Sequence, residues 1–504
     1  MQPLILNGNP LALDIIHQVA HDAHRFHIQL DPSCSKKVAF ARQYVLNLAQ
    51  SNTPVYGINT GISSTAAQKI DLADIEQLQY NIVRSHCAGV GRALPRHLVR
   101  AMMLIRANCL AKGNSGIDPS IIDLILAFLH HDITPVVLEQ GSVGASGDLA
   151  PLAQIALALI GEGDVEFQQQ TMPAQEALAQ CKLSPARLGP KDGLALINGT
   201  TAMAALGQDA LWYAQNLVQT ADVVGALTAD SMRASSAPFA AAIQQVKPHP
   251  GQIQSAQNLH QLLADSEIGK EHAYCDKVQD QYSLRCMPQV HGAARQALGH
   301  AKEVVLTEVN SVTDNPLIFP EEQKIYTGGN FHGAEIALAL DYLAMGLTVL
   351  GSISERRTEK MLDPAFSEQN LFLAKIPHLE SGLMLAHVTA AALVNENKLL
   401  STPASVDSIP TSANLEDHVS MGMNAARKLL TIVDNTANIL AIELLTAAAA
   451  LDGRPGKTSP ALARVHQLVR QHVPPHTQDR ALQKDIQVLQ KLVKEGTVAQ
   501  VAFN

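Results

Sequence analysis

The stretch AEIALALDYLAMGLTVLGSISERRTEKML, residues 334–362, decides the fold class of this chain. It contains no proline, and its apolar side chains face more than one side of a helix, as in a helix inside a bundle. Stretches of the same kind occupy residues 200–229, 289–311, 381–400 and 417–451. Strand-like segments are short and lie at residues 165–168 and 317–326. We therefore expect a mainly α protein with a long central helical bundle.

The composition predicts a folded protein that acts on a small molecule. Of the 504 residues, 47% are hydrophobic and 16% are charged, which supplies a large core and excludes a disordered chain. The net charge of −9 comes without a basic cluster, so we expect no nucleic-acid partner. Apolar runs such as residues 149–160 are shorter than the ~20 residues of a membrane span, so we expect no membrane partner.

The cysteines and the N-terminus predict a cytoplasmic location. Residues 1–20 carry no basic segment ahead of an apolar one, as a secretory signal would. The six cysteines have no paired metal-type spacing and are typical of reduced thiols: Cys34, Cys87, Cys109, Cys181, Cys275 and Cys286. No low-complexity linker divides the chain, so we expect one catalytic unit over residues 1–504. Its N-terminal part, about residues 1–200, is mixed in structure and carries the active-site loops, and residues 201–504 form the bundle and the C-terminal helices.

Histidine-rich segments offer no obvious metal site. His21, His24 and His27 have helical spacing, but no carboxylate or cysteine pattern accompanies them, which favours a solvated helix face. His130 and His131 close an apolar helix, where they suit its negative end. The chain also has no Gly-rich phosphate loop and no His-Glu-x-x-His. We expect neither a metal nor a nucleotide cofactor.

The most informative segment is GSVGASGDLAPLAQ, residues 141–154. Glycines and serines crowd the stretch before Asp148, which has the character of an N-cap. Pro151 then lies in the first turn of an apolar helix that runs to Ile160. Read alone, this is a flexible turn that leads into a helix, or an anion cradle at the N-terminus of the helix.

The whole run resembles the signature of the aromatic amino acid ammonia-lyases, the family of histidine, phenylalanine and tyrosine ammonia-lyases. In that family an Ala-Ser-Gly triad, here Ala145, Ser146 and Gly147, cyclises autocatalytically into 4-methylidene-imidazole-5-one, an electrophilic prosthetic group. The amide nitrogen of Gly147 must attack the carbonyl of Ala145, which requires a sharply bent backbone. Ser146 then loses its hydroxyl as water.

Further segments match the family in order and imply the other site residues. VYGINTG at 55–61 resembles the mobile loop whose tyrosine, here Tyr56, is the proposed general base, and LINGT at 196–200 supplies Asn198 to hold the substrate. Three later blocks complete the set: VQDQYSLR at 278–285 with Gln279, Tyr282 and Arg285, GGNFH at 328–332 with Phe331, and TSANLEDHVSM at 411–421 with Glu416.

Each of these residues also has a purely structural interpretation. Tyr56 and Phe331 could pack against neighbours, and Asn198 could cap a helix. Arg285 could pair with an internal carboxylate, although its guanidinium suits the α-carboxylate of an amino acid.

The pair Ser85-His86 resembles the substrate-reading pair of the histidine-type enzymes, where the tyrosine type carries His-Leu and the phenylalanine type Phe-Leu. His86 can hydrogen-bond an imidazole nitrogen, unless it is simply a satisfied helix histidine. A carboxylate at Glu416 points the same way, because phenylalanine-type enzymes tend to carry glutamine there. Two departures concern loop closure: Ile62 and Ser63 follow Gly61 where Phe-Gly is usual, and Gln281 replaces a common proline.

The resemblance implies non-oxidative elimination of ammonia from L-histidine to give trans-urocanate. It also implies a homotetramer whose active sites combine residues of different subunits. Two alternatives stay open. One is a tyrosine or phenylalanine ammonia-lyase, or an aminomutase, of the same family, and the other is a non-catalytic homologue that binds or assembles.

Overall fold

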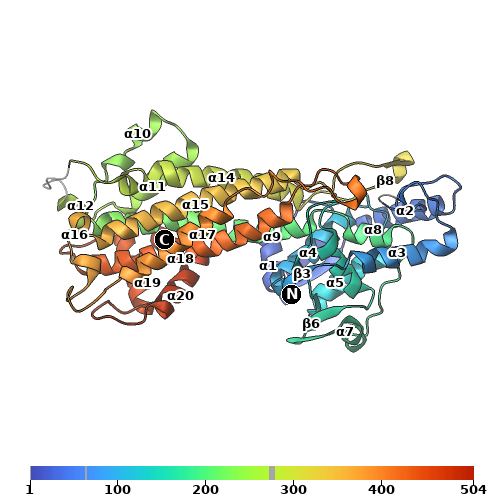
Figure 1. The fold of residues 1–504 in the computed structure, drawn as a ribbon, viewed down its shortest axis with the longest axis horizontal. Helices are drawn as coiled ribbons and strands as arrows, with labels where there is room; N and C mark the ends of the chain where they lie inside the picture. The colour runs from blue at the N-terminus through green and yellow to red at the C-terminus, as the bar shows by residue number, and fades with distance from the viewer. Residues whose placement is uncertain (1, 63–64, 272–277) are drawn as a thin grey trace. The chain divides into compact units, whose positions relative to one another are not determined.

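The computed structural model describes residues 2–62, 65–271 and 278–504 (Figure 1). Ser63 and Cys275, which the sequence analysis singled out, lie outside the described residues. The chain divides into two compact units, and each unit is assembled from separate segments. Unit 1 consists of residues 1–209, 303–340 and 403–427, and unit 2 consists of residues 210–302, 341–402 and 428–504. The expectation of a single catalytic unit stays a prediction.

Unit 1 combines helices with small sheets. Its helices before residue 200 are α1 (Leu13–His21), α2 (Pro32–Ala49), α3 (Leu72–His86), α4 (Arg96–Ala111), α5 (Pro119–His131), α6 (Leu149–Leu159), α7 (Ala174–Gln180) and α8 (Asp192–Ile197). Parallel pairing joins β1 (Gln2–Leu6) to β2 (Phe26–Leu30). The other three sheets among the described residues are antiparallel. In the first, β3 (Val90–Ala93) pairs with β5 (Leu138–Gln140), and in the second, β6 (Asp164–Phe167) lies between β4 (Thr134–Pro135) and β7 (Gln170–Pro173). In the third, β8 (Leu317–Phe319) pairs with β9 (Lys324–Tyr326).

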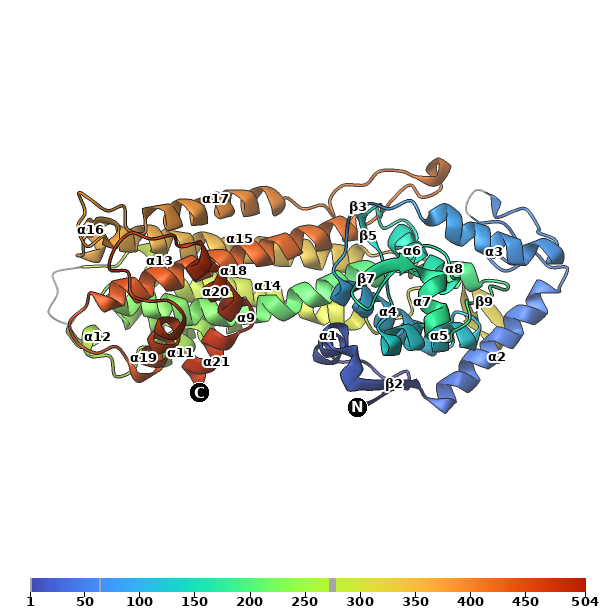
Figure 2. The ribbon, with the colours of Figure 1, turned by 90° about the horizontal axis from the view of Figure 1, so that it is seen from below.

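Long helices form the bundle of unit 2, where α9, α14, α15, α17 and α18 run side by side in both views (Figures 1 and 2). They are α9 (Thr201–Ser231), α14 (Met287–Glu308), α15 (Ala334–Leu362), α17 (Met384–Leu400) and α18 (Gly422–Asp452). The shorter helices are α10 (Ala241–Gln245), α11 (Pro250–Leu262), α12 (Glu267–Glu271), α13 (Tyr282–Arg285), α16 (Pro364–Ser367), α19 (Pro460–His472), α20 (Gln483–Lys494) and α21 (Thr497–Phe503).

A close contact between helices and a buried ion pair help to hold the bundle together. A Cβ at Gly346 would come within 3.0 Å of Ala297, so α15 approaches α14 closely. Arg357 of α15 makes a bidentate pair with Glu443 of α18, with Nε to Oε1 at 2.5 Å and Nη2 to Oε2 at 2.8 Å. Both side chains are fully buried, so their charges are compensated inside the protein.

The fold class and the long helices confirm the sequence prediction. Helix α15 has the predicted bounds, and α9, α14 and α17 begin and end within three residues of theirs. Helix α18 begins later than predicted, at Gly422 instead of residue 417, so residues 417–421 are not part of it. Met421 has a positive φ of 56°, and its backbone N–H donates to Val143 O at 2.9 Å, so these residues form a loop contact instead.

Two helices correct the expectation about apolar run length. By length and composition alone, α15 and α18 could cross a membrane. Most of each apolar window is buried inside the protein, 61% in α15 and 78% in α18, as in a core helix of a bundle. The estimate of run length considered only uninterrupted apolar stretches, whereas α15 and α18 contain scattered polar residues.

Candidate active site

The triad Ala145-Ser146-Gly147 lies in a tight loop between β5 and α6. Gly144, Ser146 and Gly147 all have positive φ, at 82°, 53° and 79°. The N–H of Gly147 donates to Gly144 O at 3.2 Å, which closes the turn. Such a bend suits attack of the Gly147 nitrogen on the carbonyl of Ala145, two residues earlier.

The loop leaves no space for a side chain at residue 147. A Cβ on Gly147 would collide with the carbonyl of Gly199, which itself has a φ of 143°. The two backbones are joined by hydrogen bonds from Gly199 N to Ser146 O at 3.1 Å and from Asp148 N to Gly199 O at 2.7 Å. The segment around Gly199 therefore forms one wall of the triad.

Asp148 occupies the predicted N-cap position of α6, but its side chain makes no hydrogen bond to the first turn of that helix. Its carboxylate accepts instead from Ser142 Oγ at 2.9 Å and from Met203 N of α9 at 2.8 Å. The side chain is fully buried, and burial raises the pKa of Asp148 to about 6, against the lowering effect of these hydrogen bonds. Asp148 thus ties the triad loop to α9.

Glu416 reaches the triad from 270 residues away in the chain. Ser146 Oγ donates to Glu416 Oε1 at 3.2 Å. The other oxygen, Oε2, accepts from Thr411 Oγ1 at 3.0 Å and from Ser412 Oγ at 2.5 Å. The carboxylate is therefore fixed at one oxygen and directed at the triad serine with the other.

Asn198 caps the end of α8 and belongs to a buried polar chain. Its Nδ2 donates to Asp314 Oδ1 at 3.1 Å and to Asn315 O at 3.3 Å. Asp314 Oδ2 in turn accepts from Lys191 Nζ at 2.7 Å, and both of these side chains are fully buried. This ion pair fixes the amide of Asn198, and the one-residue step to Gly199 brings it beside the triad.

Tyr56 lies in a turn anchored on both sides. Asn59 holds the turn, since its Oδ1 accepts from Val55 N at 2.7 Å and its Nδ2 donates to Thr53 O at 3.0 Å. A Cβ on Gly57 would come within 2.6 Å of Leu194 in α8, so the turn packs against the helix that carries Asn198.

His86 ends α3 in a defined orientation. Its Nδ1 lies 2.7 Å from Ile82 O and 3.1 Å from Ser85 Oγ. Because a carbonyl oxygen only accepts, Nδ1 carries the proton in this contact, and a neutral ring then leaves Nε2 as an acceptor. Ile82 O thereby orients the ring of His86, and Ser85 Oγ adds a longer contact.

Phe331 lies in the turn before α15, in the same unit as Glu416. The next residue, His332, donates from its backbone to Gly329 O at 2.8 Å. The His332 ring stacks on that of His418 with centroids 5.8 Å apart. The turn with Phe331 thus packs against the block that carries Glu416.

The remaining predicted residues, Gln279, Tyr282 and Arg285, belong to unit 2. The Arg285 guanidinium lies 4.5 Å from the centroid of the Tyr282 ring, and Tyr282 is 71% exposed. Gln279 and Arg285 line a depression of about 420 Å³. Gln281 has a φ of −63°, close to the value that proline would fix, so the backbone at this departure is compatible with the usual proline.

Comparison with known proteins matches this architecture along almost the full length. Residues 11–471 match the family model described as aromatic amino acid lyase. The chain belongs to the aromatic amino acid lyase family. It is 49% identical to histidine ammonia-lyase of Myxococcus xanthus, over 98% of this chain and 97% of the relative.

Two solved structures share the fold of this chain. Histidine ammonia-lyase from Trypanosoma cruzi aligns with a TM-score of 0.92 at 39% identity, covering 100% of this chain and 95% of that one. Tyrosine aminomutase from Streptomyces globisporus aligns with a TM-score of 0.92 at 35% identity, covering 99% and 98%. The fold therefore occurs in both a histidine ammonia-lyase and a tyrosine aminomutase.

Sequence reasoning missed several residues of this lyase site. Lys191 and Asp314 fix Asn198, and Ser420 lies so close to Gly144 that a Cβ there would collide with its hydroxyl. Ser420 lies within the matched segment 411–421, whereas Lys191 and Asp314 lie outside the matched segments. Long-range pairing between such residues is invisible without the fold.

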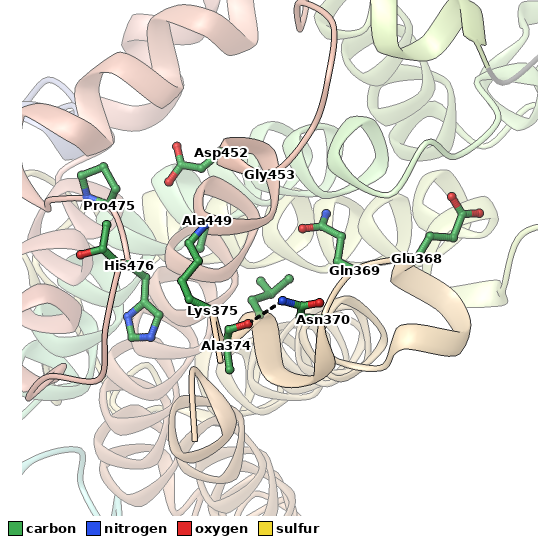
Figure 3. A pocket seen from close by; sticks show the side chains of 12 residues that line it. Glu368, Gln369, Asn370, Ala374, Lys375, Ala449, Asp452, Gly453, Pro475 and His476 are labelled. Carbon is green, nitrogen blue, oxygen red and sulfur yellow. Dashed lines mark hydrogen bonds between the residues drawn. The ribbon is translucent and has the colours of Figure 1, made fainter. Parts of the chain in front are cut away.

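A separate cavity of about 280 Å³ in unit 2 is lined by none of the predicted site residues (Figure 3). Asn370 there donates to Ala374 O at 2.9 Å. Asp452 is already paired, with His466 Nε2 at 2.8 Å and Arg470 Nη2 at 2.7 Å. The polar groups of this cavity thus serve the packing of unit 2.

Proposed function

We propose that this lyase eliminates ammonia from L-histidine to give trans-urocanate. The observation that carries the proposal is the contact between Ser146 and Glu416. It joins the cyclising triad to an acidic group suited to an imidazole substrate. Similarity to histidine ammonia-lyases over nearly the whole chain supports the same activity.

The triad is proposed to form 4-methylidene-imidazole-5-one from Ala145, Ser146 and Gly147. The positive φ at Ser146 and Gly147, and the wall at Gly199 that excludes a side chain, suit a backbone that must cyclise. When formed, the group supplies an electrophile that turns an amine into a better leaving group.

The other predicted site residues would bind and orient the substrate. Asn198 uses its amide nitrogen toward Asp314 and Asn315, so its carbonyl oxygen is the atom suited to a substrate ammonium. Arg285 is proposed to bind the α-carboxylate with its guanidinium fork, and Gln279 to orient the amine end. Tyr282 and Phe331 would shape the site and exclude water.

Tyr56 is proposed as the general base that removes the β-proton. The turn that carries it is anchored at Asn59 and packed on α8, so the phenol is presented from a fixed support. A base must lie within hydrogen-bond reach of the proton that it takes, and such an anchored turn favours that placement.

The imidazole of the substrate would be recognised by His86 and Glu416. The protonated Nδ1 of His86 is held by Ile82 O, so Nε2 can accept from a substrate N–H. Glu416 Oε1 can accept from the other side or exchange a proton. A phenyl ring offers neither donor, which favours histidine over phenylalanine.

A homotetramer with shared active sites is part of the proposal. Exposed apolar residues recur along one face of α15, at Leu338, Tyr342, Met345 and Val349. Helical spacing of four, three and four residues places them in one stripe, which favours an interface. Mixing inactive Ser146→Ala chains with inactive Arg285→Ala chains would restore part of the activity if sites combine residues of different subunits.

The test is a near-ultraviolet assay of the purified protein with L-histidine, L-tyrosine and L-phenylalanine in parallel. Urocanate from histidine alone supports the proposal, whereas a product from tyrosine or phenylalanine, or a β-amino acid, overturns the choice of substrate. Intact mass provides the control, because cyclisation removes two waters from the triad. Ser146→Ala should lack both the mass change and the activity.

A further inference from the structure

Three histidines and one aspartate converge in unit 1, on residues that the proposed reaction does not use. His17 and His21 lie on α1, His97 lies at the start of α4, and Asp209 lies on α9. Asp209 Oδ1 is 3.7 Å from His17 Nδ1 and 3.8 Å from His21 Nε2. Asp209 Oδ2 is 3.6 Å from His97 Nε2.

The helix geometry brings the donor atoms together. His17 and His21 are four residues apart, so they lie on one face of α1, and their ring centroids are 4.3 Å apart. One ligand atom from each of His17, His21 and Asp209 lies within 4.8 Å of the others. Tetrahedral bonds of ~2.0–2.1 Å place donors roughly 3.3 Å apart, so modest rotation of these side chains would complete the set.

The donor types suit a cation. The buried Asp209 carboxylate has one oxygen near nitrogens of His17 and His21 and the other near a nitrogen of His97. Carboxylate oxygens and imidazole nitrogens are both common ligands of zinc.

We propose that His17, His21 and Asp209 bind one divalent transition-metal ion of the zinc type, with His97 holding the second carboxylate oxygen. Imidazole and carboxylate ligands suit zinc, cobalt or nickel, and calcium or magnesium would require more oxygen ligands. Asp209 is 7% exposed, whereas His21 is 38% exposed. The ion would therefore enter past His21 and keep a water as its fourth ligand.

The ion would fasten the N-terminal helix to the rest of unit 1. It would join α1 to α9, and His97 would link α4 to the same carboxylate. On α9, Met203 lies six residues before Asp209 and donates to Asp148 beside the triad. Six helical residues span about 9 Å, so the ion would lie on the same helix that supports the triad loop without entering it.

The expectation of no metal rested on another grouping of histidines. The spacing of His21, His24 and His27 suggested one helix face, but α1 ends at His21, and His27 lies in β2. The partner of His21 is His17 instead. Asp209 is distant in sequence, so only the fold reveals the carboxylate.

Cobalt(II) titration of the full-length, chelator-treated protein tests the proposal. We expect visible d–d bands without thiolate-to-cobalt charge transfer, one ion per chain by elemental analysis after gel filtration, and a higher melting temperature. Asp209→Asn and His21→Gln should each weaken binding by tenfold or more. His97→Gln should weaken it by about 10–100-fold, as for a residue that orients a ligand.

His24→Gln is the matched control, because His24 lies three residues after His21 and outside the cluster; it should bind cobalt like the unmodified protein. His21 is exposed, so His21→Gln leaves folding testable by circular dichroism even if Asp209→Asn unfolds the chain. Absence of cobalt binding at neutral pH overturns the proposal. So does binding that survives His21→Gln but disappears when the cysteines are alkylated. Urocanate production is a separate readout, so failure of the metal site and failure of the proposed function are distinguishable.

Discussion

Ser146 Oγ donates to Glu416 Oε1 at 3.2 Å across 270 residues of chain. Two hydroxyl groups fix the other oxygen of this carboxylate, so Glu416 has one oxygen to offer at the triad. This arrangement gives Glu416 two possible tasks, either acid–base chemistry with the substrate or support of the triad loop. The two tasks predict different phenotypes.

Glu416→Gln should lower kcat for histidine by about 10²-fold or more, because it removes a group that can exchange a proton. The amide oxygen can still accept from Thr411 and Ser412 while its NH2 group donates to Ser146 Oγ. We therefore expect the triad to cyclise and the intact mass to show loss of two waters. Ser412→Ala, which removes only one anchor of Oε2, should have a much smaller effect. Unchanged kcat in Glu416→Gln would contradict the catalytic role.

His86→Phe should change the preferred substrate from histidine to phenylalanine. The variant cannot accept from a substrate imidazole, and an unpaired buried donor costs about 1–3 kcal/mol, or roughly 10–100-fold in kcat/KM. Ser85→Ala keeps the ring and its bond to Ile82 O, so it should be nearly silent. Equal losses on histidine and phenylalanine in His86→Phe would point to a structural role.

Gly199→Ala should block ring formation although Gly199 is not part of the triad. A Cβ would lie 2.6 Å from Thr313 Oγ1 and 2.8 Å from Arg106 Nη1, at a φ of 143° that alanine rarely adopts. Displacing this wall would unbend the backbone at Ser146 and Gly147. Intact mass should show the unmodified chain.

Gly328→Ala is the matched control for that substitution, since a Cβ at Gly328 meets nothing within 4 Å. It should cyclise and remain active. Full cyclisation in Gly199→Ala would show that the wall is not needed.

Glu443→Gln should destabilise unit 2 by about 3 kcal/mol or more, because it leaves the buried charge of Arg357 without its partner. Thr228 Oγ1 and Ser354 Oγ also donate to this carboxylate, at 2.7 and 2.6 Å, so the change disturbs a whole network. Denaturant unfolding measures the loss. Glu322→Gln removes an exposed partner of Lys324 at 3.6 Å and should change stability by less than about 1 kcal/mol.

The helices were predictable because their signal is local. Periodicity located α15 to the residue, since apolar side chains on several faces mark a helix in a bundle wherever it packs. The same reasoning wrongly predicted a helix at residues 417–421. There the backbone N–H of Met421 donates to Val143 O, and this contact outweighs the helical pattern. Local propensity cannot anticipate such a contact.

The candidate site was predictable only where a motif marks it. The triad, Asn198 and Glu416 lie in recognisable segments, and the fold brings all three motifs into unit 1. Asp148 was read as a helix cap, but its carboxylate serves Ser142 and Met203. The buried pair of Lys191 and Asp314 has no local signature, because each residue alone looks like ordinary surface charge.

Ionisation of the buried Asp148 carboxyl should lower the free energy of unfolding as the pH rises from about 4 to 7. Burial raises its pKa from 3.8 to about 6 in the folded chain, so the folded state binds its proton more tightly than the unfolded state. The resulting stabilisation is complete below about pH 4 and is lost as the pH passes 6, a change of about 1–2 kcal/mol between pH 5 and 7. Comparison with Asp148→Asn isolates the contribution of Asp148. Asparagine does not titrate, and the contributions of the other titratable groups are the same in both proteins and cancel in the difference. The stability of the unmodified protein relative to Asp148→Asn, from urea unfolding at each pH, should fall over this range; a constant or rising difference would mean that Asp148 is already ionised at pH 5.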